Sequence, residues 1–247
     1  MRNLLSTKAL LLLSPLIILV ACSKEEDKIE VPKGTLTLDV TYSVDGSPLL
    51  LDTLLYVDDV AGYAYKVTDV EYYLSDIKLI RSDSSEISVR NYQFMKAGRA
   101  GGSHFTISGI DTGSYCGISF NIGLTPLLNT FGKLPDIQDN QSMQWPAQYG
   151  NGYYFFRFSG GFGNPGDTSL LPFEMALGDN DNLVSYRFIS SIHIGLQGAS
   201  SGFDMNLNEW LKHPNDYDFN IYGPFSVGNP IAMGLLKVNG ADALNLR

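Results

Sequence analysis

The stretch Thr35–Tyr42, TLTLDVTY, decides the fold class of this chain, because apolar and polar residues alternate in it with a period of two. Such alternation is typical of a β-strand with one face on a hydrophobic core and the other in water. Asp45-Gly46 follows closely, and this dipeptide favours a tight turn between two strands. The stretch therefore predicts a half-buried strand that enters a turn.

The same pattern continues along the chain, where about ten short candidate strands follow one another at intervals of roughly 8 to 15 residues. After the first they are residues 63–68, 71–80, 87–94, 104–107, 115–120, 153–159, 173–177 and 183–195. One short helix is predicted near residues 207–213, with Asn206 as its N-cap and Pro214 as its stop. This spacing indicates a sandwich or a barrel. In the absence of internal repeats we predict an all-β, single-domain antiparallel β-sandwich.

Residues 124–152 break the pattern, because they hold three prolines and several glycines and show no sustained period. A loop of this length inside a compact domain is uncommon and is usually functional or disordered. Its aromatic residues and Leu127-Leu128 argue against disorder. We therefore expect any binding site in segment 143–152. The stretch Tyr153–Phe158 is predicted to be a core strand whose alternate aromatic side chains face inward.

The first 21 residues have the organisation of an export signal. Arg2 and Lys8 precede Ala9–Val20, an apolar run of about a dozen residues that is shorter than the ~20 needed to span a membrane. The run ends in Leu-Val-Ala-Cys, and small residues before a cysteine are typical of bacterial lipoproteins. We predict that residues 1–21 are removed and that Cys22 carries acyl chains such as palmitate as the new N-terminus.

The next segment is polar. We predict that residues 22–34 comprise the lipidated Cys22 and a solvated tether, and that residues 35–247 form the folded domain. The acidic stretch Ser23–Lys28 resembles the signal that directs Bacteroidetes-type lipoproteins to the outer cell surface. The prediction is an outer membrane lipoprotein held by the lipid on Cys22, with the cell surface favoured over a periplasm-facing anchor.

Charge and cysteine content exclude some classes of protein. The full chain has a net charge of −9, and loss of residues 1–21, which contain two basic and no acidic residues, leaves 226 residues with a charge of −11. An acidic chain without a basic stripe is a poor nucleic-acid binder. With Cys22 lipidated, only Cys116 remains, so no intramolecular disulfide forms and the core must supply the stability. We expect Cys116 to be a buried, unreactive thiol rather than a metal ligand.

Common catalytic motifs are missing from the sequence, among them Gly-x-Ser-x-Gly, His-Glu-x-x-His, a phosphate-binding loop and Cys-x-x-Cys. Gly160–Gly163 follows a predicted strand without opening a helix, which indicates a hairpin. Asp179–Asn182 lacks the glycine and the distal glutamate of a calcium loop, which indicates a solvated turn. We therefore predict a protein that is not an enzyme.

The chain has only three histidines. His213 precedes Pro214 at the end of the predicted helix, where a cation is favourable and the role is structural. His193 stands among apolar strand residues, so we expect a core histidine that bonds a carbonyl, with a ligand role as the alternative. His104 by itself indicates little.

Five short elements, in order over about residues 35–225, match a known pattern. They read DVEYYLSDIKL at 69–79, IDTGSY at 110–115, FNIG at 120–123, MQW at 143–145 followed by GYYFFRFSG at 152–160, and HIG at 193–195. Together they resemble the MbnP-like domain family, periplasmic or lipidated proteins named after a copper-binding protein of methanobactin operons. The resemblance implies a β-sandwich with an export signal. In some relatives it also implies a Cu(I) site built from histidines, near a tryptophan that a partner di-haem cytochrome c peroxidase-like protein oxidises to kynurenine.

In this chain the resemblance offers His193 as a copper ligand, with His104 and Met143 beside it, and Trp145 as the oxidisable aromatic. Imidazole and thioether donors suit Cu(I). The chain also departs from the family pattern. The second tryptophan expected shortly after Trp145 is missing, and Ser159 stands where the family has an acidic residue.

Two functions from different classes follow. The first is a copper-binding carrier or scavenger without catalytic turnover, which requires His193 and His104 to lie within ~4 Å of each other or of Met143. The second is a metal-free binding or adhesion module that contacts a glycan or a protein. That function predicts Trp145, Tyr149 and Trp210 exposed on one patch.

Overall fold

The computed structural model describes residues 30–53 and 55–247. The predicted export signal, Cys22 and most of the predicted tether lie outside the described residues. Residues 31–247 fold together as one unit. In the part of the chain that is described, no helix is both long enough and apolar enough to cross a membrane.

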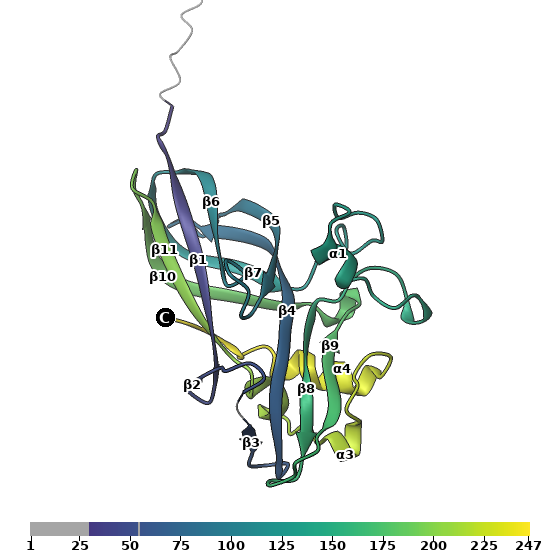
Figure 1. The fold of residues 1–247 in the computed structure, drawn as a ribbon. Coiled ribbons are helices and arrows are strands. Elements are labelled where there is room, and N and C mark those ends of the chain that lie inside the picture. The colour runs from purple at the N-terminus through teal and green to yellow at the C-terminus, as the bar shows by residue number, and fades with distance from the viewer. Residues whose placement is uncertain (1–29, 54) are drawn as a thin grey trace, which may run out of the picture. The chain divides into compact units, whose positions relative to one another are not determined.

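Two β-sheets form this unit (Figure 1). The first sheet contains β1 (Lys33–Val44), β2 (Ser47–Pro48), β6 (His104–Asp111), β11 (Ala199–Asn206) and β12 (Leu244–Leu246). The second sheet contains β3 (Tyr56–Asp58), β4 (Tyr63–Ile80), β5 (Glu86–Lys96), β7 (Gly113–Ile122), β8 (Phe156–Gly163), β9 (Leu171–Leu177) and β10 (Val184–Ile194). The predicted all-β sandwich is confirmed.

β1 has the alternation that its sequence predicts. Leu36, Leu38 and Val40 are buried, while the residues between them are partly exposed. Asp45 and Gly46, with φ values of 49° and 81°, form the turn into β2, as a tight hairpin requires. β1 pairs antiparallel with β6 but parallel with β11, so one pair departs from the predicted antiparallel arrangement. No hairpin joins β1 to β11, and the connection therefore leaves their relative direction free.

β4 is the central strand of the second sheet. Its 18 residues pair with four other strands, because different parts of its length meet β3, β5, β7 and β8. The sheet order is β10-β7-β4-β8-β9, and β5 pairs with β4 outside this path. Within the described chain β5 has β4 as its one strand partner, so its other edge pairs with no strand and is called the free edge. At the end of that edge the Lys96 N–H donates to the Gly102 carbonyl at 2.9 Å.

The aromatic stretch before β8 is buried more completely than its sequence predicts. Tyr153, Tyr154, Phe155 and Phe156 are all buried in succession, so the expected alternation is wrong for them; it holds only from Phe156 to Phe158. The Phe155 N–H donates to the carbonyl of β9 residue Leu177 at 2.7 Å, while loop residues cover the other side of the stretch. A segment enclosed on both sides buries consecutive side chains.

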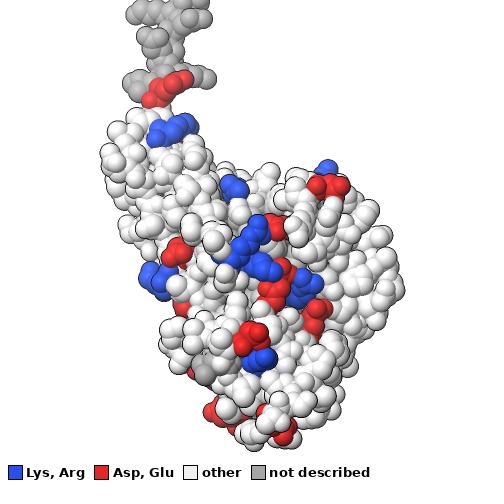
Figure 2. All heavy atoms as spheres, in the orientation of Figure 1, with Lys and Arg blue, Asp and Glu red and all other residues white. Residues whose placement is uncertain are grey.

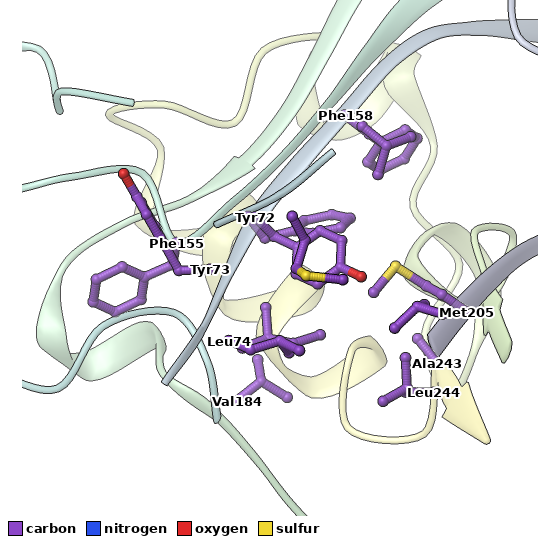
Figure 3. Close-up of a cluster of buried hydrophobic side chains, with 14 of the residues drawn as sticks. Tyr72, Tyr73, Leu74, Phe155, Phe158, Val184, Met205, Ala243 and Leu244 are labelled. Atoms are coloured by element: carbon purple, nitrogen blue, oxygen red, sulfur yellow. The ribbon is translucent and has the colours of Figure 1, made fainter. Parts of the chain in front are cut away.

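The core between the sheets also receives the C-terminal segment. In Figure 3, Tyr72 and Leu74 of β4, Phe158 of β8 and Met205 of β11 point into one cluster, which Ala243 and Leu244 complete. All of these side chains are buried. The last residues of the chain therefore contribute directly to the core that the early strands build.

Four α-helices lie among the described residues: α1 (Gln138–Ser142), α2 (Glu209–Lys212), α3 (Phe219–Tyr222) and α4 (Pro230–Asn239). Two short 3₁₀-helices, η1 (Ala147–Tyr149) and η2 (Asn180–Asn182), accompany them. The predicted helix near 207–213 is confirmed as α2, but its N-cap is Asn208, so the prediction of Asn206 is wrong. The longest helix, α4, was missed although its sequence carries the usual signals. Asn229 caps it by accepting from the Ala232 N–H at 3.1 Å, Pro230 stands at its first turn and Gly240 follows its end.

Charged side chains of both signs gather near the middle of one face (Figure 2). The contacts identify an ionic network across β4, β5 and β8. Glu71 is only 4% exposed and accepts from Lys96 Nζ at 2.7 Å and from Arg157. Lys96 also pairs with Asp69 at 3.0 Å. Each member of this network has an oppositely charged partner, so the network reads as structural.

Candidate functional site

The two histidines proposed as ligands lie on different sheets. His104 begins β6 opposite Asp39, and His193 stands near the end of β10 opposite Ser114. His104 stands at the start of β6, whereas Ser114, the partner of His193, follows the other end of β6. The seven residues from His104 to that end span ~23 Å, so the two histidines lie far apart. Both imidazoles are exposed. The expectation of a core His193 is therefore wrong; its Nδ1 lies 3.1 Å from the Ser114 hydroxyl.

Met143 and Trp145 are buried where the 124–152 loop covers the aromatic stretch. The Met143 carbonyl accepts from the Tyr154 N–H at 2.7 Å. The Trp145 ring meets the Tyr154 ring edge to face, with centroids 4.9 Å apart, and its indole N–H donates to the Tyr149 carbonyl at 3.4 Å. Trp145 is 5% exposed. The two side chains act as packing for the loop.

The predicted aromatic patch does not form. Trp210 is completely buried and stacks on Phe156, whereas Tyr149 is 47% exposed. A large indole contributes most to stability when it is buried in the core, and α2 places Trp210 there. The expectation that Trp145, Tyr149 and Trp210 share one exposed surface is therefore wrong.

Cys116 also differs from its sequence expectation. The thiol is free and exposed on β7, not buried. It lies two residues from Ser114 on the same strand, near a register shift between Ile189 and Ile192 of β10. A shift of this kind breaks the simple relation between strand position and burial, which explains the error.

The 124–152 loop instead contributes one wall of a cleft of about 510 Å³. The opposite wall is the free edge of β5, and the β5–β6 loop closes one side. The lining residues are Arg90, Asn91, Tyr92, Gln93, Phe94, Arg99, Ala100, Gly101, Gly102, Ile137, Asp139 and Asn140. The loop residues that line the cleft precede segment 143–152, where a site was predicted, so that prediction is wrong for this cleft. The facing strand was predicted at residues 87–94, but not as part of a site.

The direction of the β5 backbone follows from its neighbour β4. The Tyr73 N–H donates to the Phe155 carbonyl at 3.0 Å and the Tyr73 carbonyl accepts from the Gly123 N–H at 2.8 Å, so both groups point away from β5. Phe94 is opposite Tyr73 in the register, and its backbone groups therefore point to the free edge. Tyr92 lies two residues before Phe94 on the same strand, so its backbone groups also point to the free edge. Both residues present an N–H and a carbonyl to the cleft.

Side chains already occupy the two edge carbonyls. The Arg90 Nε–H donates to the Tyr92 carbonyl at 3.3 Å, and the Gln93 amide donates to the Phe94 carbonyl at 3.0 Å. Arg90 Nη2 also donates to Gln93 Oε1 at 2.6 Å, which fixes both side chains. The edge is thereby left richer in donors than in acceptors.

The wall made by α1 is fixed through a buried amide. Asn140 is 3% exposed, and it accepts from the Tyr73 hydroxyl at 2.8 Å and donates to the Pro135 carbonyl at 2.8 Å. Burial raises the pKa of Tyr73, so its hydroxyl stays a donor. Across the mouth, Arg99 Nη1 pairs with Asp139 Oδ1 at 2.6 Å. The cleft is therefore preformed on both sides.

A larger groove of about 830 Å³ lies beside β1 and β2. Its two carboxylates already have partners within the protein. Asp204 accepts from the Thr41 hydroxyl at 2.7 Å, and Asp39 pairs with Arg247 at 3.0 Å. Burial raises the pKa of its Tyr42 to about 12 and keeps that hydroxyl neutral. The β5 cleft instead contains the Arg90 guanidinium, which donates only to uncharged oxygens.

The sequence profile described as MbnP matches residues 33–227, most of the chain. The chain belongs to the MbnP family. Among solved structures, MbnP from Methylosinus trichosporium is similar at 13% identity and a TM-score of 0.49, over 76% of this chain and 81% of that chain. No curated protein matches the sequence. Membership of the MbnP family confirms the resemblance seen in the five sequence elements.

A copper site of the kind that the resemblance to the MbnP family implies needs several soft donors at one point, with metal–nitrogen bonds near ~2 Å. His104 and His193 are on different sheets, and His213 lies beside Glu209 at the end of α2. Across residues 30–53 and 55–247, no three His, Cys, Asp or Glu side chains come close enough to share a metal. The residues present do not fit a histidine-built copper site.

Neither arginine of the cleft was identified from the sequence. Arg90 lies in Glu86–Lys96, a strand whose sequence is more polar than the other strands and whose side chains are mostly partly exposed. That polarity was the available signal for an edge strand. Nothing in the sequence indicated that α1, more than 40 positions later, would face it.

Proposed function

We propose that this protein is a lipid-anchored binding protein that holds a ligand in the β5 cleft without catalytic turnover. The observation that carries the proposal is the cleft itself. Its volume of about 510 Å³ lies within the ~300–1,000 Å³ typical of ligand sites. Hydrogen bonds within the protein fix the walls, so little ordering is needed when a ligand binds.

The anchor is part of the proposal. The order of charged, apolar and small residues before Cys22 supports an exported lipoprotein, and the acidic stretch after it supports the outer cell surface. The polar residues that follow Cys22 would then separate the folded domain from the lipid.

A cleft-filling substitution tests the binding function. Ala100 is exposed in the β5–β6 loop and lines the cleft, so Ala100→Trp places an indole in the ligand volume with little effect on the fold. On an array of neutral, amino and acidic oligosaccharides we expect the full chain, purified in detergent, to bind at least one class, and the variant to bind it at least about tenfold more weakly.

Ala147→Trp is the matched control, because Ala147 is exposed but does not line the cleft. Its binding and its melting temperature should equal those of the unsubstituted chain. The proposal fails if the array shows no binding, or if Ala100→Trp binds as well as Ala147→Trp.

Copper loading gives the opposite expectation. After anaerobic Cu(I) titration against a competing chelator, we expect the chain to retain no more copper than the His104→Ala/His193→Ala variant, because the two imidazoles do not converge. If the unsubstituted chain retained one equivalent of copper and His193→Ala lost it, the result would support the copper-carrier function and, with it, a di-haem peroxidase-like partner. Intact mass spectrometry of the same sample reports oxygen on Trp145 and acylation of Cys22.

A further inference from the structure

We propose that the β5 cleft recognises a carboxylate-bearing saccharide of the uronic acid type, with the carboxylate held by Arg90 and by the edge N–H groups of Tyr92 and Phe94. The inference rests on the proposed function of the cleft and names the chemical class of its ligand. Three features of the cleft carry it: the unpaired guanidinium, the donor-rich strand edge, and the chemistry of the remaining lining.

Of the two arginines that line the cleft, Arg90 is the one without an acidic partner. Its guanidinium donates to one backbone carbonyl and one amide oxygen, and its carbon lies 5.6 Å from the centre of the Phe105 ring. Within residues 30–53 and 55–247 it forms no ion pair. An arginine has five N–H groups, so about three remain free here. Their planar fork matches a carboxylate.

Placement of this charge is unusual for such an acidic protein. The predicted mature chain carries −11, yet the cleft contains Arg90 and Arg99 against one carboxylate, Asp139, which Arg99 already pairs. The surrounding negative charge repels anions in general. Because the rest of the protein repels anions, the positively charged cleft favours an anion that contacts its arginines directly.

The strand edge adds donors at the same place. The carbonyls of Tyr92 and Phe94 are bonded to the Arg90 and Gln93 side chains, while their N–H groups face the cleft. Backbone N–H groups beside a guanidinium form the donor set of an oxyanion site. A carboxylate supplies the acceptors that these donors lack.

The occupied carbonyls also decide between a saccharide and a peptide. A peptide that adds to a strand edge must donate its own N–H groups to the edge carbonyls. Here Arg90 and Gln93 take those acceptors, as protected edge strands do. A sugar acid brings acceptors and hydroxyls without amide donors. Asn91 and the aromatic residues Tyr92 and Phe94 complete a lining of amides and rings.

Isothermal titration of the full chain in detergent tests this assignment with three probes: trigalacturonate, its methyl ester and galactotriose. We expect trigalacturonate to bind, the methyl ester and galactotriose to bind at least about tenfold more weakly, and Arg90→Gln to reduce trigalacturonate affinity about 10- to 100-fold. Arg90→Lys should recover only part of the loss, because it keeps the charge but not the fork.

Arg81→Gln is the matched control, since it removes the same charge from an exposed arginine outside the cleft. It should bind trigalacturonate like the unsubstituted chain. Equal losses in Arg81→Gln and Arg90→Gln would overturn the site. Binding of poly-glutamate that depends on Arg90 as strongly would overturn the saccharide class.

The outcomes separate this inference from the function on which it rests. Binding of galactotriose that Ala100→Trp abolishes and Arg90→Gln leaves unchanged would keep the binding function and refute the acidic ligand. Absence of binding by any saccharide probe, on the array as well as by titration, would refute both.

Discussion

Trp210→Ala is expected to lower the free energy of unfolding by about 3–5 kcal/mol, the range for removing a large aromatic side chain from a core. The Trp210 ring is completely buried and lies parallel to the Phe156 ring at 10°, with the centroids 3.8 Å apart. A Cβ built on Gly240 would come within 2.3 Å of the indole, so the backbone after α4 packs directly on it. No small shift refills such a space.

Urea unfolding followed by circular dichroism measures this loss, with Tyr149→Ala as the control. Tyr149 is 47% exposed, and its removal should change the free energy of unfolding by no more than ~0.5 kcal/mol. Trp210→Phe should cost less than Trp210→Ala, because it keeps a ring on Phe156 and the indole N–H has no partner to lose among the described residues. A cost below 1 kcal/mol for Trp210→Ala would return Trp210 to the surface.

Arg157→Ala is expected to cost about 3 kcal/mol, because it removes one partner of a buried carboxylate. Glu71 is 4% exposed and accepts from Arg157 and from Lys96. The low end of the usual range applies, since Lys96 stays within 2.7 Å. The Arg157 guanidinium also lies 5.0 Å from the centre of the Tyr154 ring, so the variant loses that contact too.

The pH dependence of this cost identifies its cause. Burial raises the pKa of Glu71, but the hydrogen bonds from Lys96 and Arg157 outweigh burial and hold the pKa below its ordinary value. A lowered folded pKa stabilises the fold above the unfolded pKa of ~4.3, and the contribution is lost as pH falls through the folded pKa. In Arg157→Ala one of the hydrogen bonds that lower the Glu71 pKa is lost, so the effect of burial is larger and Glu71 is more readily protonated.

The difference in unfolding free energy between Arg157→Ala and the unsubstituted chain should therefore be largest at neutral pH and shrink below about pH 4.3. Chemical denaturation at pH 7 and pH 4 measures both values. Adding Glu71→Gln to Arg157→Ala should recover part of the loss at pH 7, because the buried charge is gone. A pH-independent difference would assign the cost to the Tyr154 contact instead.

Local pattern was sufficient for the fold class. Strand β1 was predictable because successive residues in a strand alternate between two faces. Helix α2 was predictable from its stop at Pro214, whereas its N-cap is Asn208 and not the predicted Asn206. Helix α4 shows that the same signals were present and overlooked, in Asn229, Pro230 and Gly240. The errors at Tyr153–Phe156 and at Cys116 have another origin. Covering layers and strand irregularities there override the local period.

The sequence also pointed to the 124–152 loop, which does form part of the cleft. It pointed within that loop to Met143 and Trp145, and both are buried. The residues that face the cleft are in α1, a few positions earlier. A sequence shows that a long loop has aromatic residues, but burial of each one depends on what lies beneath it.

By itself the sequence determined the β-rich fold, the family and the acidic character of this protein, because each is written in local periods, short elements and composition. The tertiary structure alone decided which side chains meet. It separated His104 from His193, took Trp210 into the core, and set Arg90 across from Asp139 of α1. These outcomes depend on the register of β5 with β4 and on the parallel pairing of β1 with β11, which long-range packing fixes and local sequence does not encode.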